Sequence, residues 1–301
     1  MFDIIIIGAG PAGLTSAIYG RRANKKVLVL EEKNFGGQII NTMDIENYPA
    51  LYHISGFDFA NNLYHQALKL GAEIKFEKVI KILNGKIKKV YTKNNIYEAK
   101  TIIVATGCVN KEIGLENEKA LIGKGISYCA TCDGAFYKNK TVCVVGGGNT
   151  AIEDALYLSS IVKEVFLIHR RNSFRADKKT IELLKEKENV HFIYDSVITK
   201  INGYDRLESI IINNDKEIKT DGLFIAIGKK PENSLLSFLK LDENGYVLSK
   251  ENCHTNRKGI FVAGDVRRKD LRQLVTATSD GAIAANEAIK YLSIYEDDTL
   301  K

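Results

Sequence analysis

Two cysteines, Cys129 and Cys132, stand at the ends of the sequence CATC, a spacing that suits a dithiol able to open and close as a disulfide. Two glycine-rich stretches lie on either side of this pair: GAGPAG begins at Gly8 and GGGNTA begins at Gly146. Such stretches hold the pyrophosphate of a dinucleotide when they join a strand to a helix. Each motif alone is ambiguous, and the cysteine pair could be only structural. Their combination predicts two dinucleotides and a dithiol on one electron path.

The two glycine-rich stretches belong to one unit that the chain contains twice. An apolar run before each stretch predicts a buried parallel strand, and the runs KVLVL and EVFLI predict the strand after the intervening helix. This repeat predicts an α/β fold with two Rossmann-like dinucleotide-binding domains of the three-layer ββα type. The corresponding pairs include Gly8 and Gly146, Gly10 and Gly148, Gly13 and Ala151, Ala17 and Ala155, and Val27 and Val165.

Within each unit the small residues have separate functions. The first glycine permits a tight turn, the second lets the backbone approach a pyrophosphate, and the third position must be small so that helix and strand can touch. The helix start offers free N–H groups to the phosphates and tolerates proline. The expected cofactor-binding residues are Gly8, Gly10, Pro11, Ala12 and Gly13 in the first unit, and Gly146, Gly148, Asn149, Thr150 and Ala151 in the second.

The end of the second strand differs between the units. The first unit has Glu31 there, and a carboxylate suits the hydroxyl groups of an unphosphorylated ribose. The second unit has His169 at the equivalent position, followed by Arg170, Arg171 and Arg175, and arginines bind a 2′-phosphate. The first unit is therefore expected to bind FAD or NAD and the second NADP(H), although HRRNSFR could be only an exposed basic turn.

A segment near the C-terminus favours a flavin in the first unit. Gly264-Asp265 follows the apolar run GIFVA, and Asp265 could hydrogen-bond a ribityl hydroxyl, although an ordinary turn aspartate has the same appearance. Arg272-Gln273-Leu274 then opens a helix-like segment whose amides could face a flavin ring. With these contacts, the chain leaves the first domain, builds the second and returns.

Composition limits the class of protein. A length of 301 residues suits two domains. No apolar run is long enough to cross a membrane, and the early glycine stretch leaves no room for a cleavable signal peptide, so we expect a cytoplasmic protein. The net charge of +6 is modest and dispersed, which argues against a nucleic-acid partner. No second CxxC or histidine pair follows at ligand spacing, so we expect no metal site.

The chain resembles the low-molecular-weight thioredoxin reductases along essentially its whole length. The resemblance rests on YCATCDGAFY, GGGNTA, HRRNSFR, and a Gly-Asp pair followed by Arg-Gln-Leu. It also includes Ala105-Thr106-Gly107, Gly36-Gly37-Gln38 and Glu46-Asn47-Tyr48-Pro49. The position of CATC is specific, because related flavin disulfide reductases carry their dithiol near the N-terminus.

The resemblance implies a homodimer with one FAD per subunit, which oxidises NADPH and reduces the disulfide of thioredoxin. It also implies that residues 1–112 and 245–301 form an FAD-binding domain. Residues 113–244 would form an NADPH-binding domain that is inserted into it and carries the dithiol. Further contacts with FAD are implied for Gly36, Gly37, Gln38, Asn47, Ala105, Thr106, Gly107, Gly264, Asp265, Arg272, Gln273 and Leu274.

The resemblance also assigns roles around the dithiol. Cys132 would face the flavin, and Cys129 would attack the disulfide of thioredoxin through a mixed disulfide. Asp133 would protonate a departing thiolate, although a carboxylate near a helix start also serves as a cap. Two alternatives stay open: an NADPH-dependent flavin reductase or oxidase for another disulfide or dithiol substrate, and a non-enzymatic redox sensor.

Overall fold

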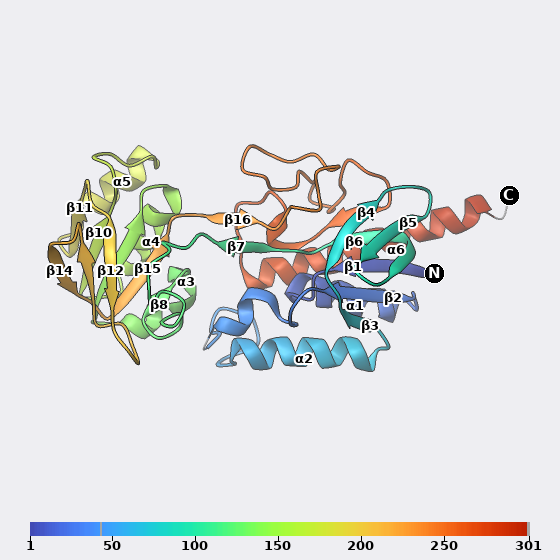
Figure 1. Ribbon diagram of the computed structural model, residues 1–301, viewed down its shortest axis with the longest axis horizontal. Coiled ribbons are helices and arrows are strands. Elements are labelled where there is room, and N and C mark those ends of the chain that lie inside the picture. The colour runs from blue at the N-terminus through green and yellow to red at the C-terminus, as the bar shows by residue number, and fades with distance from the viewer. Residues whose placement is uncertain (43, 300–301) are drawn as a thin grey trace. The chain divides into compact units, whose positions relative to one another are not determined.

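The computed structural model describes residues 1–42 and 44–299, without the side chains of residues 295–299, and contains two compact units (Figure 1). Unit 1 comprises Met1–Val109 and Lys230–Lys301, and unit 2 comprises Asn110–Lys229. Residues 43, 300 and 301, which belong to the predicted FAD-binding domain, lie outside the described residues.

Both boundaries between the units come earlier than the sequence predicts. The predicted changes fall after residues 112 and 244, whereas the observed units change after Val109 and after Lys229. The larger difference has a packing cause, because Leu236 and Leu239 are buried in the apolar core of unit 1 together with Ile5. The segment that follows Lys229 therefore belongs to unit 1 and not to unit 2.

Unit 1 is built on a seven-stranded sheet. At its centre β1 (Phe2–Ile7) pairs in parallel with β2 (Val27–Glu31) and β6 (Ile96–Val104), and β17 (Ile260–Val262) pairs in parallel with β6. β1 and β2 are almost continuously apolar because both faces of a parallel sheet are covered. The remaining strands are β3 (Glu73–Phe76), β4 (Val79–Leu83) and β5 (Lys88–Thr92).

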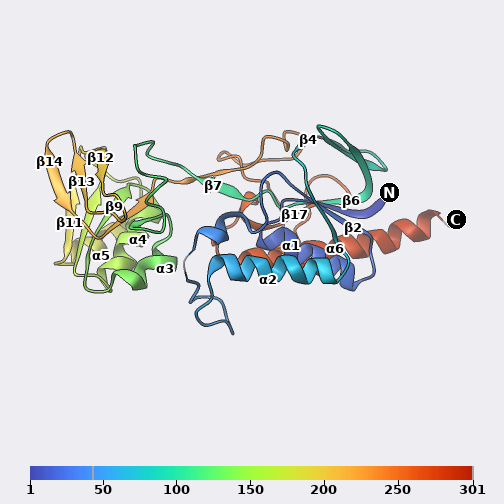
Figure 2. The ribbon, with the colours of Figure 1, turned by 60° about the horizontal axis from the view of Figure 1, so that its bottom comes forward.

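Alternate residues of β1 face two different apolar clusters. Ile4 and Ile6 belong to the cluster that α1 and α6 share, whereas Ile5 and Ile7 belong to the cluster on the opposite face. Figure 2 shows the helices of unit 1 together on one side of the sheet. These helices are α1 (Pro11–Arg22), α2 (Gly56–Lys69) and α6 (Leu274–Thr299).

Unit 2 repeats this plan on a five-stranded sheet. Here β9 (Thr141–Gly146) pairs in parallel with β10 (Glu164–Ile168) and β15 (Gly222–Ala226), as β1 does with β2 and β6. One face is covered by helices, and the other by an antiparallel three-stranded sheet, which makes three layers. The other elements are β8 (Ile126–Ser127), β11 (Val190–Ile193), β12 (Ile198–Asn202), β13 (Ser209–Ile212), β14 (Lys216–Lys219), α3 (Ala130–Asp133), α4 (Asn149–Ser159) and α5 (Lys178–Lys185).

Two paired strands, β7 (Cys108–Asn110) and β16 (Lys229–Pro231), carry the chain from unit 1 to unit 2 and back (Figure 1). Among the residues that the structure describes, three 3-10 helices occur at turns, namely η1 (Gly37–Asn41), η2 (Gly134–Tyr137) and η3 (Gly264–Val266). Within the described part of the chain, no helix has both the length and the apolar character that a bilayer crossing requires.

Candidate active site

The first glycine-rich turn leaves no room for side chains at two positions. A Cβ on Gly8 would lie 2.3 Å from the carbonyl oxygen of Ala105, and a Cβ on Gly13 would lie 1.9 Å from the carbonyl oxygen of Gly8. Strand β1, the end of β6 and helix α1 therefore meet in direct backbone contact. Apart from the chain neighbours of Gly10, no atom of the described residues lies within 4 Å of the same position on that residue. This open side, at the N-terminus of a helix that begins with Pro11, can accept a pyrophosphate.

Two further predicted residues lie beside this turn. Glu31 accepts the N–H of Ala9 at 2.8 Å through one carboxylate oxygen and the N–H of Lys33 at 3.0 Å through the other. The N–H of Gly36 donates to the carbonyl of Ala9 at 2.8 Å, and a Cβ on Gly37 would approach Gly10 to 3.4 Å. The glycine loop that precedes Gln38 in η1 is thus fixed against the nucleotide turn.

Asp265 provides the observation that tests whether FAD fits unit 1. One carboxylate oxygen, Oδ2, accepts the thiol S–H of Cys108 at 3.8 Å. The other, Oδ1, is buried and has no hydrogen-bond partner among the described residues. A buried acceptor without a donor costs about 1–3 kcal/mol. A ribityl hydroxyl of FAD would supply the missing donor, so the residues present fit this cofactor.

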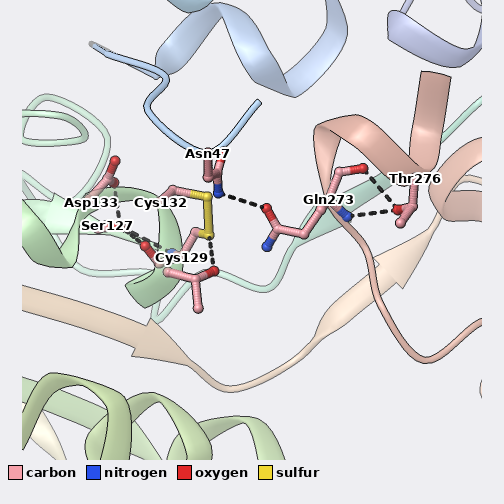
Figure 3. The surroundings of a disulfide bond; sticks show 8 residues. Asn47, Ser127, Cys129, Cys132, Asp133, Gln273 and Thr276 are labelled. Atoms are coloured by element: carbon pink, nitrogen blue, oxygen red, sulfur yellow. Dashed lines mark hydrogen bonds between the residues drawn. A yellow bond between two sulfur atoms is a disulfide. The ribbon is translucent and has the colours of Figure 1, made fainter. Parts of the chain in front are cut away.

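The predicted segment Arg272-Gln273-Leu274 forms the edge of the same site. The guanidinium of Arg272 donates to the carbonyl of Asp265 at 3.3 Å and lies 3.9 Å from the ring centre of Tyr246. The side chain of Gln273 accepts from Asn47 at 3.3 Å, as Figure 3 shows. Arg272 therefore holds the backbone that carries Asp265, a role that its position in the sequence did not reveal.

The predicted residues that follow β6 form hydrogen bonds with the segment through which the chain returns to unit 1. The hydroxyl of Thr106 donates to the carbonyl of Glu232 at 2.6 Å, and the N–H of Glu232 donates to the carbonyl of Gly107 at 3.0 Å. These bonds tie the end of β6 to the segment that follows β16. The structure thus brings Ala105, Thr106 and Gly107 to the same end of the sheet as the first glycine turn.

The second glycine-rich turn has the same construction in unit 2. A Cβ on Gly146 would lie 2.4 Å from the carbonyl oxygen of Ala226 and 2.7 Å from the Cβ of Ala151. The position on Gly148 is open, as it is on Gly10. Helix α4 begins at the next residue, Asn149, and Thr150 follows in its first turn.

The arginine segment is attached to this second turn. The N–H of Arg175 donates to the carbonyl of Gly147 at 2.8 Å, and the N–H of Asp177 donates to the side chain of Asn149 at 3.0 Å. The side chains of Arg170, Arg171 and Arg175 are exposed, and within the described part of the chain none of them forms an ion pair. Three exposed cations beside a pyrophosphate turn suit a 2′-phosphate.

His169 occupies the position of Glu31 but is arranged differently. Its ring is buried over Gly147, where an added Cβ would lie 2.0 Å from the ring, and its Nε2 lies 3.1 Å from the carbonyl oxygen of Ser173. Burial lowers the pKa of the imidazole, the bond to Ser173 opposes this, and the nearby arginines lower the pKa further. A neutral His169 therefore donates to Ser173 and holds the arginine loop in place.

The two cysteines form a disulfide at the start of the short helix α3. The hydroxyl of Ser127 accepts the N–H of Cys129 at 3.1 Å and donates to a carboxylate oxygen of Asp133 at 2.6 Å (Figure 3). Burial raises the pKa of the Asp133 carboxyl above its usual range, and the bond from Ser127 offsets only part of this rise. Asp133 can thus keep a proton beside Cys132 at a higher pH than an ordinary carboxyl.

A second anchor holds the backbone before Cys129. The phenol of Tyr128 donates to the buried carboxylate of Glu118 at 2.8 Å, and Glu118 also accepts the N–H groups of Ile113 and Gly114. No local sequence pattern predicted a role for Ser127, Tyr128 or Glu118. A serine two residues before the first cysteine was visible, but the distant glutamate gave no local signal.

The three other cysteines are buried, and none of them lies beside the disulfide in the sequence. Burial in the core of unit 2 raises the pKa of Cys143 to about 12, so this thiol stays protonated. Cys108 lies beside Asp265, as described above. Among the described residues, Cys129 and Cys132 are the two cysteines that form a disulfide.

Comparison with known proteins decides the family. A family model described as pyridine nucleotide-disulphide oxidoreductase matches residues 2–281. A thioredoxin reductase of Bacillus subtilis is 40% identical over 100% of this chain and 98% of its own length. One from Mycoplasma genitalium is 43% identical over 94% of this chain and 93% of its own. The chain belongs to the thioredoxin reductases of this family.

Solved structures agree with this membership. The thioredoxin reductase of Streptococcus pyogenes matches with a TM-score of 0.92 and 41% identity, over 97% of this chain and 98% of that one. The thioredoxin reductase of Giardia duodenalis matches with a TM-score of 0.90 and 34% identity, over 97% and 99%. The predicted resemblance and the fold with two Rossmann-like domains are confirmed.

Membership in the family also decides the class of chemistry. The prediction of an oxidoreductase enzyme is confirmed, and FAD and NADPH are the cofactors of this family. An enzyme of this class is not the non-enzymatic redox sensor that the sequence alone also allowed.

Proposed function

We propose that this chain transfers electrons from NADPH to the disulfide of a thioredoxin through FAD in unit 1 and the Cys129–Cys132 pair in unit 2. The observation that carries the proposal is the group of Cys129, Cys132 and the partly buried Asp133 in one unit with an arginine-flanked nucleotide turn. The relatives and solved structures named above are thioredoxin reductases. This supports thioredoxin as the substrate.

Unit 1 is proposed to bind FAD. The open face at Gly10 and the N-terminus of α1 would receive the pyrophosphate, Glu31 a ribose, and Asp265 the ribityl chain. The loop at Gly36, Gly37 and Gln38, the segment Ala105–Gly107, and the pair Asn47 and Gln273 would line the rest of the site. When bound, FAD supplies the hydride-accepting group that links a two-electron nicotinamide donor to a disulfide.

Unit 2 is proposed to bind NADPH. Gly146, Gly148 and the first turn of α4 would hold the pyrophosphate. Arg170, Arg171 and Arg175 would bind the 2′-phosphate, which an NADH lacks. His169 would hold the arginine loop in place and would not bind NADPH itself, because its ring packs over Gly147 and its Nε2 is hydrogen-bonded to the carbonyl of Ser173.

The dithiol is proposed to act in a fixed order. After the disulfide opens, Cys129 attacks the disulfide of thioredoxin and forms a mixed disulfide, and Cys132 then displaces the reduced product. Asp133 holds the proton that a departing thiolate needs. The hydroxyl of Ser127 holds the carboxylate of Asp133 and the backbone N–H of Cys129 in position during this cycle.

The proposal is tested by NADPH oxidation in the presence of oxidised thioredoxin. The wild-type protein is expected to reduce thioredoxin, whereas Cys129→Ser and Cys132→Ser are expected to reduce only ferricyanide, which accepts electrons without the dithiol. Reduction of thioredoxin by either variant at the wild-type rate would refute the proposal. A preference for another disulfide carrier over thioredoxin would favour the second candidate function, a reductase for a different disulfide substrate.

We further propose that the protein works as a homodimer, as the family resemblance implies, and that it is located in the cytoplasm. Sedimentation of the purified protein tests the first part and cell fractionation tests the second. A single monomeric species at cellular concentration would contradict the dimer.

A further inference from the structure

Asp280 on helix α6 lies at the centre of a buried charged cluster that the proposed chemistry does not use. One oxygen, Oδ2, accepts the N–H of Gly264 at 3.0 Å and the ammonium of Lys269 at 2.8 Å. The other, Oδ1, accepts from the guanidinium of Arg267 at 3.2 Å. The side chains of Arg267, Lys269 and Asp280 are only 5%, 8% and 10% exposed.

A contribution to folding stability does not by itself explain this charged cluster. Burying charges has a desolvation cost that their attraction often fails to recover, and two cations here share one closely bound carboxylate. The Nε of Arg267 is also buried and has no hydrogen-bond partner among the described residues. An arrangement with these costs is better explained by the group that it holds in position.

The group held in position is the turn that carries Asp265. Gly264 is the residue before Asp265, and its N–H is bonded to Asp280. A Cβ on Gly264 would lie 2.9 Å from the Cβ of Ala12, and a Cβ on Gly281 would lie 2.3 Å from the carbonyl oxygen of Ala12. The Gly264 turn, the start of α1 and the residues around Asp280 therefore meet at one point, beside the proposed pyrophosphate face.

We propose that Asp280 is a positioning residue for FAD: by holding the N–H of Gly264, it aims the buried, partnerless Oδ1 of Asp265 at the ribityl chain and presses the turn against the N-terminus of α1. Arg267 and Lys269 balance the charge of Asp280 and do not contact the cofactor. The proposal rests on the assignment of FAD to unit 1.

The test is the affinity of the full-length apoprotein for FAD, measured by quenching of flavin fluorescence, with NADPH affinity as a check on unit 2. Asp280→Ala removes the acceptor for Gly264 and is expected to weaken FAD binding about tenfold. Asp280→Asn keeps an acceptor oxygen and is expected to recover part of this loss. Lys269→Met keeps the bond between Asp280 and Gly264, and Asp270→Asn changes an exposed aspartate on the same loop. Both are expected to bind FAD as the wild type does.

The outcomes separate this proposal from the proposed function. A wild-type protein that binds no FAD would refute the assignment of FAD, whereas wild-type binding with an unchanged Asp280→Ala affinity would overturn only the role of Asp280. An equal loss of FAD affinity in Asp280→Ala and Lys269→Met would also overturn it, because the effect would then belong to the charge cluster as a whole. If Asp280→Ala does not fold, Asp280→Asn decides: weaker FAD binding with normal NADPH binding supports the proposal, and unchanged FAD binding contradicts it.

Discussion

The two nucleotide units share a strand–turn–helix plan and differ where their second strands end. In unit 1 the carboxylate of Glu31 accepts two backbone N–H groups beside the glycine turn. In unit 2 the ring of His169 is buried over Gly147, and exposed arginines extend from the loop after it. In the proposed assignment, the turn would fix where a dinucleotide lies, and the residues after the second strand would decide which dinucleotide binds.

The units also differ in the reactive groups that each adds to this shared plan. Unit 1 adds the carboxylate of Asp265, one oxygen of which is buried and has no hydrogen-bond partner among the described residues. Unit 2 adds a disulfide and a carboxylate, Asp133, whose pKa burial raises. In the proposed function both units hold a dinucleotide, and unit 2 alone adds groups that would exchange protons and electrons with a disulfide.

Of the substitutions that test the difference between the two units, removal of the dithiol should have the largest effect on activity. In Cys129→Ser and Cys132→Ser, NADPH-dependent reduction of thioredoxin is expected to fall to background, because no mixed disulfide can be formed and resolved. Stopped-flow measurement of flavin reduction by NADPH should show that the nucleotide sites still work. Cys143→Ser, a change at a buried core thiol, is the matched control and should keep thioredoxin reduction.

Asp133→Asn is expected to slow thioredoxin reduction by about 100-fold, because the variant lacks a proton for the departing thiolate. In the wild type the proton remains on Asp133 up to the raised pKa, so the rate should fall as pH rises through that value. A pH–rate profile of the variant should lack this fall. Asp205→Asn, at an exposed position of the same unit, should behave as the wild type.

The same raised pKa has a consequence for stability. The folded protein holds the proton of Asp133 more tightly than the unfolded chain does, so this carboxyl lowers stability as pH rises from its unfolded pKa through its folded pKa. Asp133→Asn is therefore expected to raise the thermal unfolding midpoint at neutral pH and less so at acidic pH. A lower midpoint at neutral pH would show that the bond with Ser127 outweighs desolvation.

Replacing Arg170 and Arg171 by alanine should raise the KM for NADPH roughly 30-fold and leave that for NADH unchanged, because only NADPH carries the phosphate that they would bind. Steady-state kinetics with both donors measures this. Arg206→Ala, at an exposed arginine elsewhere in unit 2, is the control. If the preference for NADPH over NADH did not change, these arginines would not distinguish the nucleotide site of unit 2 from that of unit 1.

The smallest expected effect concerns unit 1. Glu31→Gln keeps the shape of the side chain and loses its charge, so the affinity for FAD should fall about fivefold while that for NADPH stays the same. Fluorescence titration of the apoprotein measures the first and kinetics the second. The matched change His169→Gln should leave FAD affinity unchanged; if it weakens FAD binding as much as Glu31→Gln does, the units are not independent.

The glycine turns could be predicted from sequence because their requirements are local. Gly13 and Ala151 were both predicted to be small: a Cβ on Gly13 would lie 1.9 Å from the carbonyl oxygen of Gly8, and the Cβ of Ala151 would lie 2.7 Å from a Cβ on Gly146. The contacts of Asp280 with Gly264, and of Glu118 with Tyr128, could not be predicted, because they join residues that are brought together only by tertiary packing. The domain boundary after Lys229 was missed for a similar reason, since nothing in the local pattern shows which core Leu236 fills.

The most direct test of the central claim is an anaerobic reductive titration of the purified holoprotein with NADPH or dithionite. If the disulfide of Cys129 and Cys132 accepts electrons from bound FAD, the protein should take up two electron pairs, one for each group. Cys129→Ser should then take up only one. Uptake of a single pair by the wild-type protein, with the disulfide still intact, would contradict the account.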